Sequence, residues 1–129
     1  MKTNPNGRKF VSETAFIENR EGQMEVVPQI LEQLRNLNVT AENELKLEYF
    51  FYTNKVEKAK QLATEIEKLN YTVEYDIAAG DNKSFVVTGW TTKMKMADEI
   101  VQQWTKQMCE LGYKFDCDFD GWGTTPDQE

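Results

Sequence analysis

In four stretches of the chain, nearly every second residue is hydrophobic, and the residues between them are mostly polar. Such alternation is typical of a strand with one buried face. Three further stretches space their hydrophobic residues three and four positions apart, which is typical of a helix with one buried face. The predicted strands cover residues 45–52, 71–77, 84–90 and 113–119, and the predicted helices cover 28–37, 56–69 and 97–111.

The order of these elements, after the leading helix, is β-α-β-β-α-β. Two right-handed crossovers joined by a hairpin, with its turn at Gly80-Asp-Asn, give a four-stranded antiparallel sheet with both later helices on one face. The sequence therefore predicts an α+β fold, a ferredoxin-like sandwich preceded by an N-terminal helix. The core positions expected between sheet and helices are Leu47, Tyr49, Val73, Tyr75, Phe115, Cys117, Leu62, Ile66, Ile100 and Trp104.

Local signals suggest where the helices begin and end. Pro28 is tolerated best in a first turn, so the leading helix is expected to begin near it. Asn54 followed by Glu57 resembles a capping box, and Thr91 or Thr92 can cap the third helix. Gly112 stands where a helix commonly ends in a left-handed conformation.

The chain divides into two parts on this pattern. Residues 1–22 have no clear period; Phe10, Val11, Phe16 and Ile17 within them form a short strand or pack against the domain. Residues 23–129 form a single domain that includes the leading helix, in keeping with the usual domain length of about 100–150 residues.

The net charge of the chain limits the class of partner that it can bind. The chain carries 15 Lys and Arg against 22 Asp and Glu, a net charge of −7. Such a balance disfavours direct nucleic-acid binding and favours a basic protein surface as partner. Without an apolar run of about 18–20 residues or a signal-peptide pattern, the sequence predicts a cytoplasmic protein without a membrane partner. Cys109 and Cys117 are interpreted as reduced core residues.

The sheet face away from the two later helices is the first place to look for binding. It should carry Phe50 and Tyr52, and exposed aromatic residues on central strands stack bases in RNA-recognition domains of this topology. The alternative is that the leading helix covers this face. Five carboxylates expected on this face make RNA binding unlikely: Glu74, Asp76, Asp116, Asp118 and Asp120. The third strand should add either Val86 and Trp90 or Phe85 and Val87 to the same face.

Candidate catalytic and metal-binding chemistry is sparse. The chain has no histidine and no nucleophile-elbow, phosphate-loop or dinucleotide-binding motif, so we expect no enzyme and no cofactor. The run from Asp116 to Asp127 has calcium-loop spacing, but it alternates like a strand. Met94 and Met96 are expected to pack rather than to bind metal.

The sharpest motif closes the chain: Asp120-Gly121-Trp122-Gly123-Thr124 after an acidic strand. Both glycines permit positive φ, so Trp122 can pack back on the domain while Asp120 or Thr124 bonds local N–H groups. Alternatively, Trp122 anchors a partner. The motif, the Leu47–Thr53 strand, Lys68-Leu69-Asn70-Tyr71 and Leu111-Gly112-Tyr113 resemble the family called regulator of ribonuclease E activity B (RraB), over roughly residues 28–125.

This resemblance implies a protein inhibitor that binds the endoribonuclease, in its best-known members at the non-catalytic scaffold region, and alters RNA decay. It implies no catalytic residue. The alternative function is a ferredoxin-like small-molecule-sensing or dimerising domain, which a cleft lined by Phe50, Tyr52 and Trp90 would favour. The residues expected to contact a protein partner are Glu74, Asp76, Asp116, Asp118, Asp120, Gly121, Trp122, Gly123 and Thr124.

Overall fold

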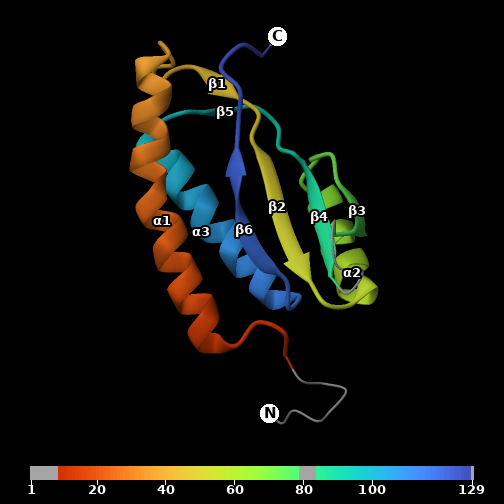
Figure 1. Cartoon of the computed structure of the whole chain (residues 1–129). Coiled ribbons are helices and arrows are strands. Elements are labelled where there is room, and N and C mark those ends of the chain that lie inside the picture. The colour runs from red at the N-terminus through yellow and green to blue at the C-terminus, as the bar shows by residue number, and fades with distance from the viewer. Residues whose placement is uncertain (1–8, 79–83, 129) are drawn as a thin grey trace.

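The computed structural model describes residues 9–78 and 84–128. They form three α-helices and two antiparallel sheets, of four and two strands, so the predicted α+β class is confirmed (Figure 1). The elements are α1 (Glu13–Asn36), β1 (Glu44–Leu45), β2 (Glu48–Thr53), α2 (Val56–Glu67), β3 (Glu74–Ile77), β4 (Phe85–Trp90), β5 (Met94–Lys95), α3 (Asp98–Lys114) and β6 (Asp118–Gly123).

The larger sheet has the strand order β3-β4-β2-β6, and every neighbouring pair is antiparallel. Helix α2 follows β2, and helix α3 comes after β4 and the short β5. Both helices lie on the same face of this sheet (Figure 1). No helix in the described part of the chain lies over the opposite face (Figure 1). The two layers place the core on one side and leave the other side of the sheet open.

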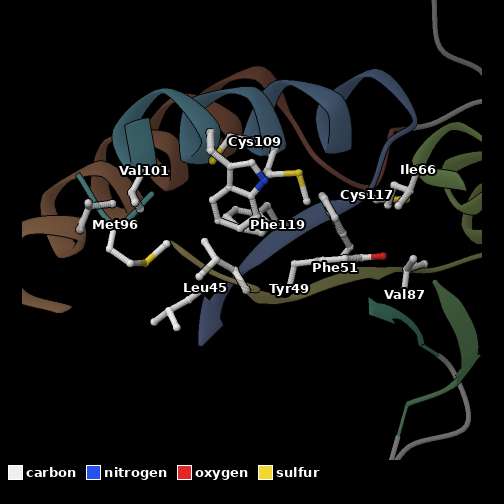
Figure 2. Packing of buried hydrophobic residues seen from close by; sticks show 14 of the residues in the cluster. Leu45, Tyr49, Phe51, Ile66, Val87, Met96, Val101, Cys109, Cys117 and Phe119 are labelled. Carbon is white, nitrogen blue, oxygen red and sulfur yellow. The ribbon is translucent and has the colours of Figure 1, made fainter. Parts of the chain in front are cut away.

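Strand β2 shows why the layers form. Tyr49, Phe51 and Thr53 are fully buried towards the helices, whereas the intervening side chains are half-buried on the other face. Phe51 lies opposite Val87 on one side and Phe119 on the other, and these side chains meet the helices in one continuous cluster (Figure 2). Complete burial of a side chain of this size stabilises the fold by about 1.5–3 kcal/mol.

Helix α1 differs from the prediction in both length and position. It begins at Glu13, where the Ser12 hydroxyl accepts a hydrogen bond from the Ala15 N–H at 3.1 Å, and it continues through Pro28. The expected start near Pro28 was therefore wrong, and the boundary at residues 22 and 23 falls inside the helix. In the early turns of α1, Phe16 stacks on Tyr113 of α3, with ring centroids 4.2 Å apart.

The predicted helix caps were also wrong. Helix α2 has Lys55 at its N-cap position and no side-chain cap, and Asn54 instead accepts a hydrogen bond from the Lys58 ammonium. Helix α3 has Ala97 at its N-cap position. Thr91 is buried, where its hydroxyl accepts a hydrogen bond from the Leu47 N–H and donates one to the Thr92 carbonyl.

Gly112 does not end α3. A Cβ atom there would lie 2.8 Å from the Phe51 ring and 2.7 Å from the Cys117 carbonyl oxygen, so the glycine permits close packing. The helix ends at Lys114, and the N–H of Cys117 donates back to the Gly112 carbonyl in a Schellman-type cap with Asp116 at φ 61°. The predicted strand 113–119 is thus a helix end, a turn and the first residues of β6.

Two exposed positions, Ile100 and Tyr75, were assigned wrongly to the core. Ile100 is 39% exposed and Tyr75 is also 39% exposed, because both lie at the margins of the layers. Trp104, at 6% exposed, occupies the core as predicted, and Met96, which was expected to pack, is fully buried. The short β1 and β5 pair with each other, an element that the alternation did not predict.

Cys109 and Cys117 are free and buried, in agreement with the prediction. Burial raises the pKa of both thiols to about 12. No helix among the described residues is long and apolar enough to cross a membrane.

Candidate partner-binding surface

A β-bulge in β6 determines where the terminal motif points. Phe119 lies opposite Phe51 and Gly121 lies opposite Phe50, so Asp120 is an extra residue without a partner in β2. Gly121 has φ +124°, a conformation that residues with a side chain rarely adopt. The extra residue shifts the alternation by one, and Trp122 therefore faces the helices, opposite Tyr49.

Trp122 is packed into the protein, as one of the two sequence interpretations proposed. Its indole meets the Trp104 ring edge to face at 6.0 Å and packs against the core cluster. Two details of the expected turn differ. Gly123 has no positive φ. The Thr124 hydroxyl donates to the distant Lys46 carbonyl at 2.7 Å and accepts from the Gln128 side-chain amide at 2.8 Å, rather than bonding a local backbone N–H.

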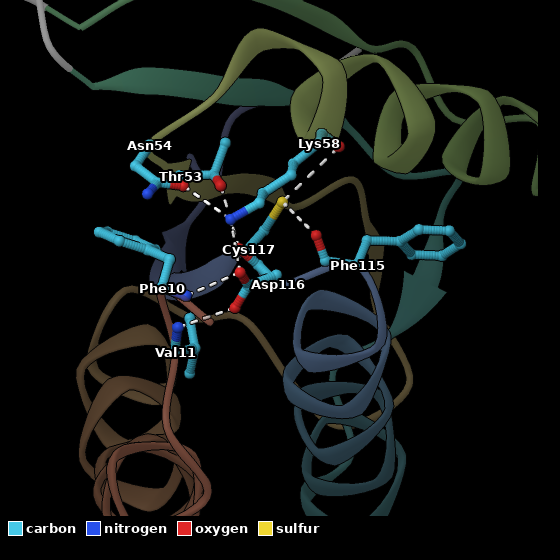
Figure 3. Close-up of polar contacts among 8 residues, drawn as sticks. All are labelled: Phe10, Val11, Thr53, Asn54, Lys58, Phe115, Asp116 and Cys117. Atoms are coloured by element: carbon cyan, nitrogen blue, oxygen red, sulfur yellow. Dashed lines mark hydrogen bonds and ion pairs between the residues drawn. The ribbon is translucent and has the colours of Figure 1, made fainter. Parts of the chain in front are cut away.

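Asp116 does not lie on an outward strand face. Its carboxylate accepts hydrogen bonds from the N–H groups of Phe10 (2.7 Å) and Val11 (2.8 Å), and from the Lys58 ammonium at 2.6 Å (Figure 3). Its carbonyl accepts a hydrogen bond from the Thr53 hydroxyl at 3.0 Å. With its side chain only 15% exposed, Asp116 joins the N-terminal segment, α2, β2 and the end of α3.

These contacts control the charge of Asp116. Burial by itself would raise the pKa of this carboxyl, but the hydrogen bonds from Lys58, Phe10 and Val11 and the charge of Lys58 together lower it below its usual value. The carboxylate is therefore ionised and fully occupied within the fold. Sequence reasoning missed this role because Lys58 is distant in sequence and residues 10 and 11 had no assigned element.

Asp118 and Asp120 lie together on β6, next to α1. The Asn19 amide donates to the Asp118 carboxylate at 3.3 Å and to the Phe119 carbonyl at 2.8 Å, so α1 covers part of this sheet edge. Burial, and then the charge of Asp120, raise the pKa of Asp118. Asp120 is exposed at the bulge.

Glu74 and Asp76 lie on β3, at the opposite edge of the sheet. All four residues of this strand are exposed. One Asp76 carboxylate oxygen accepts a hydrogen bond from the Ile77 N–H at 2.7 Å. With two strands between β3 and β6, the two acidic pairs are separated by about 14 Å, three strand spacings of roughly 4.8 Å.

The open face of the sheet lies between these pairs, and its central strands carry mostly aromatic and neutral residues with one carboxylate, that of Glu48. The register places Val86 and Trp90 on this face, opposite Tyr52 and Glu48, which resolves the alternative left by the sequence. None of the residues in β2, β3, β4 and β6 is Lys or Arg. We refer to the following set as the acidic sheet face: Glu48, Phe50, Tyr52, Glu74, Asp76, Val86, Thr88, Trp90, Asp118 and Asp120.

The expectation that the leading helix covers this face was wrong. Helix α1 packs mainly on α3 and touches the sheet at β6, as its position beside α3 in Figure 1 shows. The central aromatic side chains Phe50, Tyr52 and Trp90 are therefore only half-buried by their neighbours. A cavity of about 270 Å³ lies at one end of the face, lined by Glu48, Thr72, Val73, Glu74, Thr88, Gly89 and Trp90.

The structure therefore places only some of the nine residues expected at a partner site on one common surface. Glu74, Asp76, Asp118 and Asp120 are on or beside the open face, whereas Asp116 and Trp122 have structural contacts. Glu48 was missed, although its place in the alternation of β2 was a sufficient signal.

Comparison with known proteins agrees with the resemblance seen in the sequence. A search of curated proteins found no match. Residues 25–124 match the model of the family described as Regulator of ribonuclease activity B (RraB), which includes α2, α3 and every strand of the sheets. This chain belongs to the RraB family of regulators of ribonuclease activity.

Proposed function

We propose that this protein is a non-catalytic regulator that binds a ribonuclease, or a basic scaffold region of it, through the acidic sheet face and thereby modulates RNA decay. The observation that carries the proposal is the charge of this face. Its strands contain five carboxylates and no cation, in a chain whose net charge is −7: Glu48, Glu74, Asp76, Asp118 and Asp120.

A protein partner fits this surface better than RNA does. Phosphate groups are repelled by the same carboxylates that attract Lys and Arg, and RNA affinity depends on cations that this face lacks. Electrostatic attraction of a basic partner accelerates encounter, and half-buried aromatic side chains at the centre can then exclude water from the contact. Regulation by binding needs no catalytic group of its own.

The alternative function, a small-molecule-sensing or dimerising domain, has less support. The cavity contains Trp90 but neither Phe50 nor Tyr52, which the predicted small-molecule cleft would combine. Self-association through the open face would bring the five carboxylates of one copy against those of another, which is unfavourable.

We further infer that the chain from the N-terminal segment at Phe10 and Val11 through β6 forms one ferredoxin-like domain that acts in the cytoplasm, because α1 crosses the boundary expected at residues 22 and 23. The β2-α2-β3-β4-α3-β6 order, the strand order β3-β4-β2-β6 and two helices on one face support the ferredoxin-like assignment. The two free, buried cysteines are consistent with a reducing compartment.

The direct test is a cleavage assay with a purified endoribonuclease of the ribonuclease E type from the same organism and a labelled RNA. Addition of this chain should slow cleavage, and a ribonuclease truncated to its catalytic region should be inhibited less, because the scaffold region is the proposed partner. Cleavage of the RNA by this chain alone would contradict a non-catalytic role. Unchanged cleavage by the complete ribonuclease would contradict regulation.

A further inference from the structure

The cavity on the acidic sheet face is lined by residues of three neighbouring strands, β2, β4 and β3. Glu48 on β2 lies opposite Trp90 in the register, and Glu74 on β3 lies opposite Thr88. Both carboxylates therefore flank β4, with the backbones of β2 and β3 about 10 Å apart, two strand spacings. The cavity thus combines two carboxylates, an indole and the hydroxyls of Thr72 and Thr88.

Three polar side chains of this cavity lack partners among the residues that the structure describes, whereas the Thr72 hydroxyl accepts a hydrogen bond from the Trp90 N–H at 2.8 Å. Neither Glu48 nor Glu74 forms an ion pair with any described residue. The Thr88 hydroxyl oxygen is buried and has no hydrogen-bond partner, a situation that costs free energy in a folded protein. A ligand with several donors and a positive charge would satisfy all three groups.

The size of the cavity limits the ligand. At about 270 Å³ it is smaller than most small-molecule sites, which measure roughly 300–1,000 Å³. One long side chain is a better match than a complete metabolite. Since the rest of the face is open and acidic, that side chain can belong to a larger partner that continues across the sheet.

We propose that this cavity binds one arginine side chain of the protein partner; the inference rests on the proposed function for the existence of that partner. A guanidinium is planar, stays charged and carries five N–H donors, so it can bond two carboxylates and a hydroxyl while it stacks on Trp90. Lysine offers a compact ammonium with three donors and stacks less well. The arginine fixes the register of the basic segment on the sheet.

The test uses the complete chain and a probe that does not involve ribonuclease. N-acetyl-arginine methylamide is titrated while the Trp90 indole N–H signal is followed by NMR, assigned with Trp90→Phe. We expect a saturable shift of this signal, with little change for the indoles of Trp104 and Trp122. The neutral citrulline analogue should bind at least about tenfold more weakly, because charge-assisted hydrogen bonds are lost.

Substitutions in the cavity and a lysine analogue test whether Glu48 and Glu74 bind the ligand and whether the cavity prefers arginine. Glu48→Gln combined with Glu74→Gln should weaken arginine binding by about tenfold or more, whereas Glu67→Gln on α2, which is exposed and away from the cavity, should not. No shift of the Trp90 signal, equal binding of the arginine and lysine analogues, or binding unaffected by the double substitution would each overturn the proposal. Arginine binding without any effect on ribonuclease cleavage would contradict the regulatory function while leaving the cavity's specificity intact.

Discussion

The indole of Trp122 meets that of Trp104 edge to face, with ring centroids 6.0 Å apart and ring planes at 85°. The bulge at Asp120 and Gly121 makes this contact possible, because it turns Trp122 to the helix side of the sheet. The terminal motif thus joins β6 to α3. Its two glycines and its tryptophan have different roles, and substitutions can separate them.

The contact between the two indoles should be measurable by a double-mutant cycle. Trp104→Ala should lower the free energy of unfolding by about 3–5 kcal/mol, because the side chain is buried mid-helix against the sheet. Trp122→Ala should cost about 2 kcal/mol because this ring is half-exposed. Urea denaturation of the double variant should reveal a coupling of about 0.5–1.5 kcal/mol. Strict additivity would mean that the rings do not interact.

Gly121→Ala should destabilise the protein by about 1–3 kcal/mol, because a side chain at φ +124° is strained although space is available. Gly123→Ala is the matched control, since Gly123 has no positive φ and no atom within 4 Å of an added Cβ. Thermal melts of the two variants compare the effects directly. Equal losses of stability would argue against the bulge as the reason for glycine at position 121.

The same chemical change should have opposite effects at Asp116 and Asp118. Asp116→Asn should lower stability at neutral pH by about 1–3 kcal/mol, since it weakens the bonds to Lys58, Phe10 and Val11. Asp118→Asn should raise the melting temperature, because burial and Asp120 disfavour the charged form at this position.

The dependence on pH checks the sign of each effect. The lowered pKa of Asp116 gives stability that is complete above the usual aspartate pKa of about 3.9 and is lost as pH falls through the lower folded value. The raised pKa of Asp118 gives a penalty that is present above the folded value and disappears below about 3.9. The difference in stability between each variant, Asp116→Asn or Asp118→Asn, and the parent protein should therefore become smaller at acid pH. A difference for Asp116→Asn that grows in acid would contradict this assignment.

The cysteines should be inert in the folded protein. Their thiol pKa values of about 12 and their burial predict slow alkylation at neutral pH, with rapid reaction only after unfolding in urea. Stability should not change with dithiothreitol, as expected for free thiols. Fast labelling of the native protein, measured by mass spectrometry, would contradict this expectation.

The sequence predicted β2 and β4 well, because their alternation follows the burial of one face of each strand. It misplaced the last strand, since most of residues 113–119 belong to the end of α3 and the turn before β6. It failed at α1, because a start near Pro28 was expected, whereas the helix begins at Glu13 and continues through Pro28. It also failed where one residue changes the register: nothing in the alternation through Phe119 indicates that Asp120 is extra.

Part of the candidate site could be predicted from the sequence because it lies on a strand with regular alternation. Glu74 and Asp76 follow the alternation of a regular strand, and their exposure was foreseen. Asp116 was placed wrongly because its partners, the Lys58 ammonium and the N–H groups of residues 10 and 11, come together only in the tertiary structure. Charge-reversal tests therefore belong at β3, since Asp116→Lys would place a cation beside Lys58 and damage the fold.

The central claim, that the acidic sheet face binds the ribonuclease, is tested most directly by association kinetics. Glu74→Lys with Asp76→Lys is compared with Glu25→Lys and Glu32→Lys, exposed positions on α1, so that both variants change the net charge equally. Surface plasmon resonance with the immobilised ribonuclease should give association rates about tenfold or more lower for the β3 variant than for the α1 variant, with the difference shrinking as salt rises. Melting curves must first establish that both variants are folded. Equal association rates for the two folded variants would contradict the claim.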